Sequence, residues 1–272
     1  MRIWHQSFTV LEQLPAYAEG LRQHFRKVAR PDTEVVMHGM HAETYKTNYP
    51  GVDIRYGYVQ YLHGQQFVMG GMAAEERGYD AYAIMSIPEP GLRETRSIVN
   101  IPVVGYGESA MLTACMLGER IGVLMFIEGM RGVIEENVRR MGLAGRFAGA
   151  HFVGFTFNDV LQAYDQPGPL LDRFREAARG LIRQGADVII PGEAPLNLLL
   201  ARNGINRVDD VPVIDSLAAT IKMAETMVDL RRTTGVAPSR NGYFTAQPPR
   251  SRVKELLDLY GISRLAPPAE RS

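Results

Sequence analysis

The chain has 272 residues, of which 46% are hydrophobic and 22% charged, and its 30 basic residues balance 30 acidic ones. This length suits one large or two modest α/β domains. The charge balance gives no electrostatic basis for binding nucleic acid or an anionic membrane, so we expect neither partner. A single cysteine excludes an internal disulfide framework and a cysteine-based zinc site within one chain. No signal-peptide pattern or bilayer-length apolar run is present, which predicts a soluble, cytoplasmic protein.

Segments typical of strands and helices alternate along the chain. Residues at helical spacing form an apolar stripe in the first predicted helix, and short β-branched runs predict strands. The predicted segments are, in chain order, a strand ending at residue 7, a helix at 10–29, strands at 33–39 and 79–86, a helix at 91–100, a strand at 101–105, a helix at 109–120, a strand at 121–126, helices at 128–142 and 169–185, strands at 186–190 and 211–215, and a helix at 216–232. Apolar strands that alternate with helices indicate parallel sheets covered on both faces, and therefore an α/β fold.

Two segments interrupt this alternation. Residues 38–66 are long, polar and rich in tyrosine, and loops of that length in compact domains are usually functional or disordered. Residues 236–272 carry several prolines and one short helical pattern. We expect them to form a C-terminal extension with a short helix and a frayed end.

Two stretches of the chain, Gly78–Ser86 and Gly185–Glu193, follow the same pattern. Each has a glycine, an aspartate two residues later, an apolar strand, and a polar residue eight positions after the glycine. Each is followed by a helical segment and a second, related strand, IPVVG at 101–105 and VPVID at 211–215. This internal similarity predicts two structurally equivalent lobes, each with a polar residue at the end of a strand.

The repeat also predicts where a ligand binds. We expect residues 1–106 with 217–235 to form one lobe and residues 107–216 the other, related by a pseudo-twofold axis with a cleft between them. Ligands of open parallel sheets bind beyond the carboxyl ends of the strands. Ser86 and Glu193 would then converge from opposite sides on one small-molecule substrate. The alternative is that both are ordinary polar residues at strand ends.

Four parts of the sequence carry a resemblance to a known family: MRIWHQS, GYDAYAIMSIPEPGLRETRSIVNIPVVGYGESAM, GERIGVL, and GADVIIPGEAPLNLL with VPVIDSLAA. Over roughly residues 1–230 the chain resembles the cofactor-independent aspartate/glutamate/hydantoin racemase superfamily. The resemblance implies two similar α/β lobes, no cofactor, a small-molecule substrate and a homo-oligomer. It also implies that Gln6 and Ser7 lie in a loop that hydrogen-bonds the substrate.

In relatives that racemise, the positions of Ser86 and Glu193 are typically both cysteines, one removing a proton from the substrate carbon and the other returning one to its opposite face. Here neither cysteine is present, and the resemblance implies the fold but leaves the reaction open. Cys115 lies in the helix after GYGES, and its helical register predicts a core residue.

The substituted pair can still transfer protons. A glutamate has an ordinary pKa near ~4.3, and burial between lobes would raise it toward the range that a general base needs. A serine hydroxyl is a far weaker acid than a thiol and cannot act alone as a base. Ser86 can donate a hydrogen bond to an oxyanion, relay a proton, or become a nucleophile if a base lies beside it.

Three functional hypotheses follow. In the first, Glu193 removes a proton and Ser86, or water held by it, returns one, which gives a racemase, epimerase or isomerase acting on a small hydantoin-like or carboxylate substrate. In the second, Glu193 supports hydrolysis, decarboxylation or elimination, because superfamily relatives with altered cysteines include lyases. In the third, the pocket binds a ligand without turnover.

Further candidates are weaker. Ser109 opens a predicted helix and is a helix cap or an anion contact, and Ala194 beside Glu193 is also expected to contact the substrate. His38, His41 and Glu43 share a loop, but their spacing is poor for a metal, so we predict no metal and instead place His41, or a tyrosine, at the mouth of the pocket. The predicted tyrosines are Tyr45, Tyr49 and Tyr56. The resemblance implies that Met125 and Phe126 stand where relatives often carry hydroxyl residues that hold a carboxylate, which predicts a substrate that is less polar at that end or bound differently.

Overall fold

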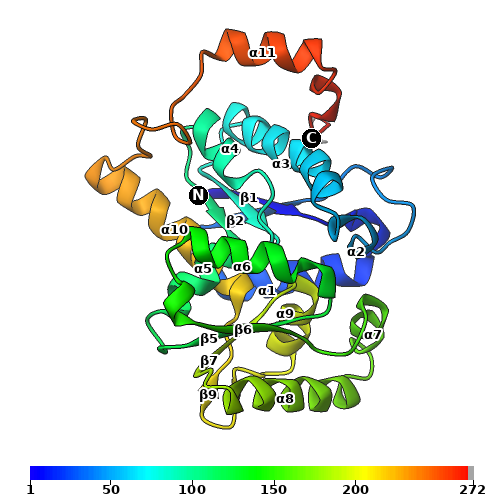
Figure 1. The fold of residues 1–272 in the computed structure, drawn as a ribbon. Helices are drawn as coiled ribbons and strands as arrows, with labels where there is room; N and C mark the ends of the chain where they lie inside the picture. The colour runs from blue at the N-terminus through cyan, green and yellow to red at the C-terminus, as the bar shows by residue number, and fades with distance from the viewer. Residues whose placement is uncertain (269–272) are drawn as a thin grey trace.

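Two parallel sheets organise the computed structural model, which describes residues 1–268 (Figure 1). The first sheet has the strand order β2-β1-β3-β4 and the second the order β6-β5-β7. Their strands are β1 (Arg2–Ser7), β2 (Glu34–His38), β3 (Ala81–Met85), β4 (Val103–Gly105), β5 (Ile121–Met125), β6 (Phe147–Phe152) and β7 (Val188–Pro191). A short antiparallel pair, β8 (Arg207–Val208) and β9 (Val211–Pro212), lies beside the second sheet, where Val213 forms a parallel bridge with Ile189.

Helices flank both sheets, and the molecule is an α/β protein with two lobes (Figure 1). The helices are α1 (Pro15–Val28), α2 (Gly51–Ile54), α3 (Gly57–Glu76), α4 (Leu92–Ile98), α5 (Tyr106–Ala114), α6 (Arg131–Arg140), α7 (Phe157–Gln162), α8 (Gly168–Arg183), α9 (Ala194–Arg202), α10 (Ser216–Thr234) and α11 (Arg250–Leu259). The fold class expected from the sequence is therefore confirmed. The residue boundaries of the lobes and their pseudo-twofold relation stay predictions. None of the helices in residues 1–268 combines the length and apolarity needed to cross a bilayer.

Three strands are buried along their whole length, as expected for parallel strands covered on both faces. Every residue of β3, β5 and β7 is buried. Gly78 and Gly185 each follow a helix and have positive φ angles of 72° and 94°, a conformation that glycine adopts at little cost when it ends a helix. Each repeat is thus a helix, a glycine, a buried strand and then a polar residue at the strand's carboxyl end.

The segment at residues 38–66 differs from its prediction as one long loop. Its second half is helical, since α2 spans Gly51–Ile54 and α3 begins at Gly57. α3 contacts both β1 and β3 on one side, and α4 and the short helix at Ser263–Leu265 elsewhere. Because α3 is covered on several sides, its sequence lacks the single apolar stripe by which we identify helices.

The C-terminal extension lies against the first lobe. α11 and the residues after it run past α3 and α4 (Figure 1). Arg240 holds the start of this extension, because its guanidinium donates to the carbonyl oxygen of Val99 at 2.6 Å and to the Asn100 side chain at 3.1 Å. The frayed end expected from the sequence falls on residues 269–272, which lie outside the described residues.

Candidate active site

The candidate site is a pocket between the carboxyl ends of the two sheets. Ser86 follows β3 of the first sheet, Glu193 follows β7 of the second, and both line this pocket. The remaining lining residues are Ser7, Phe8, Thr9, Tyr17, Tyr49, Pro50, Ile54, Met85, Ile87, Pro88, Phe126, Ile127, Met130, Phe157, Ala194 and Pro195. Strand-end residues that are more than a hundred positions apart in sequence therefore meet at one cavity.

Glu193 is the only acidic residue among residues 1–268 that lines this pocket, and it is only 6% exposed. It immediately precedes α9, and its carboxylate turns toward the loop after β5. Oε1 accepts hydrogen bonds from the backbone N–H groups of Phe126 at 3.0 Å and Ile127 at 2.9 Å, and Oε2 accepts from Phe126 at 3.1 Å. These donors fix the orientation of the carboxylate and use both lone-pair sites of Oε1, while Oε2 keeps one site for another contact.

Burial raises the pKa of Glu193 to about 8, although the N–H donors of Phe126 and Ile127 oppose the shift by stabilising the charged form. Burial, together with the negative charge of the ionised Glu193 nearby, raises the pKa of Tyr49 to about 12. A carboxyl group with a pKa near neutrality can both accept and return a proton at working pH. Glu193 thus has the properties of a general acid/base.

Ser86 is also nearly buried, with 9% of its surface exposed, and its loop turns directly after β3. No hydrogen bond joins its hydroxyl to another of the described residues. An activated serine nucleophile needs a base within hydrogen-bond reach, and none is present here. The hydroxyl is suited to donate a hydrogen bond to a ligand or to relay a proton.

Two further hydroxyl groups line the pocket, from the last residue of β1 and from the loop after it. Ser7 Oγ lies 2.8 Å from Thr9 Oγ1 and accepts a hydrogen bond from the Thr9 backbone N–H at 3.1 Å. Since one hydroxyl of this pair donates to the other, the second keeps a proton that it can donate to a ligand. Ser7 was among the predicted contacts, whereas Thr9 has no distinguishing sequence signal beyond its position two residues later.

The rest of the pocket wall is apolar and carries no compensating cation. No lysine, arginine or histidine is among the residues that line it, all of which lie within the described part of the chain. Phe126 and Met130 form the wall on the side of the second sheet, and the rings of Tyr49 and Phe157 stack with centroids 5.3 Å apart. A ligand with a full negative charge would find no partner ion in this wall, because burial of an unpaired charge is costly.

Three of the predicted substrate contacts do not line this pocket: Gln6, His41 and Ser109. Gln6 points to the opposite face of β1 from Ser7, as alternate strand residues do, and its amide donates to the carbonyl oxygens of Ser7 and Gly39. His41 lines a separate cavity and pairs with the carbonyl oxygen of Leu265 at 3.1 Å. Ala194, in contrast, lines the pocket beside Glu193.

Ser109 lies inside helix α5 and does not cap it, contrary to the sequence-based expectation. The helix begins three residues earlier, at Tyr106, with Gly105 as its N-cap. Ser109 is 1% exposed, and its hydroxyl has no hydrogen-bond partner among the described residues. It is a buried residue of the helix and does not line the pocket.

One of the three tyrosines proposed for the mouth of the pocket lines it. Tyr49 reaches from the first lobe to Phe157 of the second. Tyr45 is buried, with its hydroxyl donating to the carbonyl oxygen of Phe8, and Tyr56 lies on the surface beside Arg55. Throughout residues 1–268, no three His, Cys, Asp or Glu side chains gather in a way that could hold a metal ion.

Comparison with known proteins places this chain in a family. A family model described as Asp/Glu/Hydantoin racemase matches residues 16–224. A hydantoin racemase of Pseudomonas sp. (strain NS671) is 28% identical over 220 residues, which cover 80% of this chain and 84% of that protein. An allantoin racemase from Klebsiella pneumoniae has a similar structure, with a TM-score of 0.75 and 25% identity over 92% of this chain and 94% of that one. Arylmalonate decarboxylase shares the fold at 15% identity, with a TM-score of 0.53 over 90% of this chain and 99% of its own. The chain belongs to the Asp/Glu/hydantoin racemase family.

Proposed function

We propose that this protein is a cofactor-independent racemase or epimerase in which Glu193 is the acid/base and Ser86 its partner. The observation that carries the proposal is the meeting of a buried carboxyl group and a serine hydroxyl, from equivalent strand ends, in one apolar pocket. The buried carboxyl has a pKa of about 8, which suits reversible proton transfer near neutral pH. The matching positions of Ser86 and Glu193 in the two repeats support their assignment as a pair.

The chemistry balances without a cofactor. The ionised Glu193 carboxylate takes the acidic proton of a carbon next to a carbonyl group, and the electron pair of that C–H bond moves onto the carbonyl oxygen. The hydroxyl groups of Ser7 and Thr9 line the same pocket, and the one that does not donate within the pair can donate its proton to that oxygen. The Ser86 hydroxyl then passes a proton to the opposite face of the carbon and takes one from water, while Glu193 releases its own.

The pocket favours a neutral ring with an apolar substituent. Its wall holds aromatic and aliphatic side chains and no cation, so a malonate dianion or an acidic amino acid would be poorly accommodated. A 5-substituted hydantoin meets these requirements, because it is uncharged and its acidic carbon adjoins a carbonyl group. We therefore propose hydantoins with apolar 5-substituents as the substrate class, in preference to allantoin, whose ureido substituent is polar.

The test is solvent exchange in deuterium oxide. Single enantiomers of apolar 5-substituted hydantoins, allantoin, α-substituted malonates, hydroxy acids and small lactones are offered to the protein and followed by mass spectrometry and chiral chromatography. We expect label at the acidic carbon, together with inversion, to be fastest for the apolar hydantoins, above the rate without protein. Addition of water or loss of carbon dioxide would instead identify a hydrolase or a decarboxylase. Ligands that only raise the melting temperature would identify a binding protein.

The lone thiol provides a second test of the proposal. Cys115 is partly buried at the end of α5 and does not line the pocket. We expect Cys115→Ala to keep its activity and to lower the free energy of unfolding by about 1 kcal/mol, as for the loss of a small packed side chain. An alkylating reagent should likewise leave the folded enzyme active. Rapid stoichiometric inactivation by such a reagent would contradict a mechanism that runs through Glu193.

A further inference from the structure

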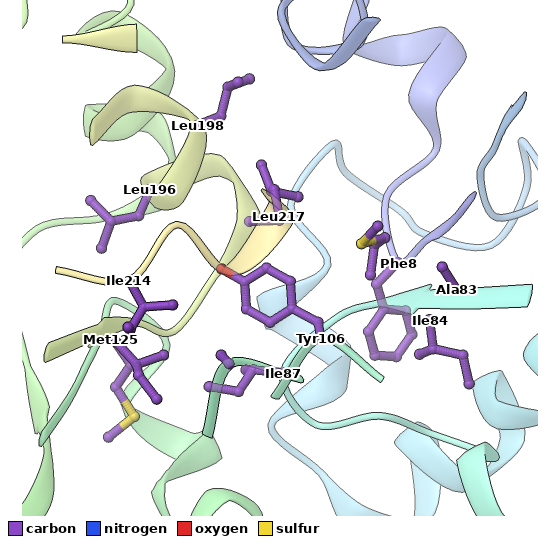
Figure 2. Close-up of a cluster of buried hydrophobic side chains, with 14 of the residues drawn as sticks. Phe8, Ala83, Ile84, Ile87, Tyr106, Met125, Leu196, Leu198, Ile214 and Leu217 are labelled. Atoms are coloured by element: carbon purple, nitrogen blue, oxygen red, sulfur yellow. The ribbon is translucent and has the colours of Figure 1, made fainter. Parts of the chain in front are cut away.

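A hydrogen bond from the first lobe holds the loop that carries Glu193. Tyr106 directly follows β4 of the first sheet and is fully buried. Figure 2 shows its ring in the middle of the core, between Phe8 and Ile84 on one side and Ile214 on the other. Its hydroxyl donates to the carbonyl oxygen of Pro191, at the end of β7, at 3.0 Å. The backbone two residues before Glu193 is thus tied to the opposite sheet.

A second set of hydrogen bonds connects a side chain of the second lobe to the loop of the first lobe that carries Ser86. Asn137 lies in α6, which packs on β6 of the second sheet, and it is 3% exposed. Its side-chain amide donates to the carbonyl oxygens of Ile87 at 3.4 Å and Pro88 at 3.3 Å. These are the two residues that follow Ser86. Each candidate catalytic loop is therefore held by a side chain that belongs to the other lobe.

Glu89, a buried glutamate, connects the Ser86 loop, to which Asn137 donates, with the helix that begins at Tyr106. The N–H of Glu89 donates to the carbonyl oxygen of Ser86 at 3.1 Å and so closes the turn after β3. Glu89 itself has a positive φ of 52°, a strained backbone conformation for a glutamate. Its Oε1 accepts from the backbone N–H of Glu108 at 2.6 Å, in the first turn of the helix that Tyr106 begins. Gly105 leaves room for this contact, since a Cβ there would lie 2.1 Å from that oxygen.

We propose that Tyr106 and Asn137 are positioning residues that set the placement of Glu193 relative to Ser86 across the pocket, an inference that rests on the proposed function. A carbonyl oxygen buried without its partner is costly, so each donor fixes the loop to which it binds. Two-face proton transfer requires both groups to be in place at once, and a misplacement of about 1 Å can cost about 10²-fold in rate. Neither residue lines the pocket, so neither contacts the substrate.

The first experiment needs no substrate. Hydrogen exchange of single backbone amides is compared in the wild type, Tyr106→Phe and Asn137→Leu, which both keep the size of the side chain. We expect Tyr106→Phe to speed exchange most at Gly192, whose N–H donates to Leu124 at 2.7 Å, by about tenfold or more. We expect Asn137→Leu to speed amide exchange most at Glu89, whose N–H donates to the carbonyl oxygen of Ser86 and closes that turn.

The matched control is Tyr82→Phe. Tyr82 is as fully buried as Tyr106 and also donates to a backbone carbonyl oxygen, that of Phe67 at 2.8 Å, but within the first lobe. We expect this variant to leave the Gly192 and Glu89 amides as in the wild type. If all three variants give the same exchange pattern, or if the two lobe-crossing variants change neither amide, the proposal is overturned.

The second experiment measures the partition between exchange and inversion in deuterium oxide. A shift in the relative position of the two groups slows inversion more than exchange with retention, because only inversion needs both. We expect Tyr106→Phe to lower the rate of inversion at least tenfold, to raise the ratio of retention to inversion, and to change KM little. A general loss of folded protein would lower both rates in proportion, and an unchanged ratio would overturn the proposal. If no substrate reacts, the proposed function fails, while the amide exchange still decides whether the loops are tied across the lobes.

Discussion

Glu193→Gln should reduce the rate of racemisation at least ~100-fold, the lower end of what a general base contributes. The substitution keeps the shape of the side chain and its contact with the N–H groups of Phe126 and Ile127 through the remaining carbonyl oxygen. It removes only the capacity to take and return a proton. Initial rates of inversion with each enantiomer of an apolar hydantoin measure the effect, and the melting temperature verifies that the variant is folded.

Glu225→Gln is the matched control for this loss. Glu225 is also a buried glutamate, 3% exposed, and its carboxylate accepts from the Arg30 backbone N–H at 2.7 Å and pairs with Lys222. It lies in α10 and does not line the pocket, so we expect its variant to lose stability and keep its rate per folded molecule. Equal rate losses in both variants would refute a catalytic role for Glu193.

Ser86→Ala separates the possible roles of its partner. If the hydroxyl passes the proton to the substrate carbon, as proposed, the variant should lose ~10²–10⁴-fold in the rate of inversion. If the hydroxyl instead stabilises an oxyanion, the variant should lose of order 10²–10³ in rate. If the hydroxyl only donates a hydrogen bond to the ligand, the loss should be smaller. A nearly complete loss, with a covalent intermediate trapped in the wild type, would instead make Ser86 a nucleophile, which the absence of a neighbouring base among the described residues argues against.

The repeat made the central part of the site predictable from sequence. Equivalent positions in two parallel sheets lie at their carboxyl ends, so Ser86 and Glu193 were expected at one cavity, and both line the same pocket. The backbone N–H groups that hold the Glu193 carboxylate have no side-chain signature, and no pattern could reveal them. Gln6 was predicted to contact the substrate together with Ser7, but successive residues of a strand point to opposite faces of the sheet, so only Ser7 faces the pocket.

The tyrosine-rich segment shows a different limit of prediction. A helix is recognised by one apolar face, but α3 packs against the first sheet on one side and against α4 and the C-terminal extension on others. Its apolar residues are therefore spread around the helix. The start of α5 was misplaced because its N-cap, Gly105, has no side chain to mark the position, and the N–H of Glu108 instead donates to the Glu89 carboxylate from another part of the chain.

The dependence of kcat/KM on pH should report the ionisation of Glu193. Its carboxyl must be ionised to remove a proton, and its pKa is raised to about 8 by burial. Below this pKa the ionised fraction grows tenfold per pH unit, so kcat/KM should rise roughly 50-fold between pH 6 and pH 8 and level off above that. An ordinary exposed glutamate, already ionised at pH 6, would give a flat profile over the same range.

Two features make this measurement specific to the enzyme. Hydantoins methylated at the imide nitrogen lack the ionisable N–H of the ring, so a rise that persists with them belongs to the protein. Two enantiomers have equal free energies, and kcat/KM must therefore be the same for both at every pH, which checks each rate against the other. Glu193→Gln should abolish the rise along with most of the rate, because no group with this pKa then acts as the base. A profile that is flat in the wild type, or that keeps its rise in Glu193→Gln, would assign proton removal to another residue.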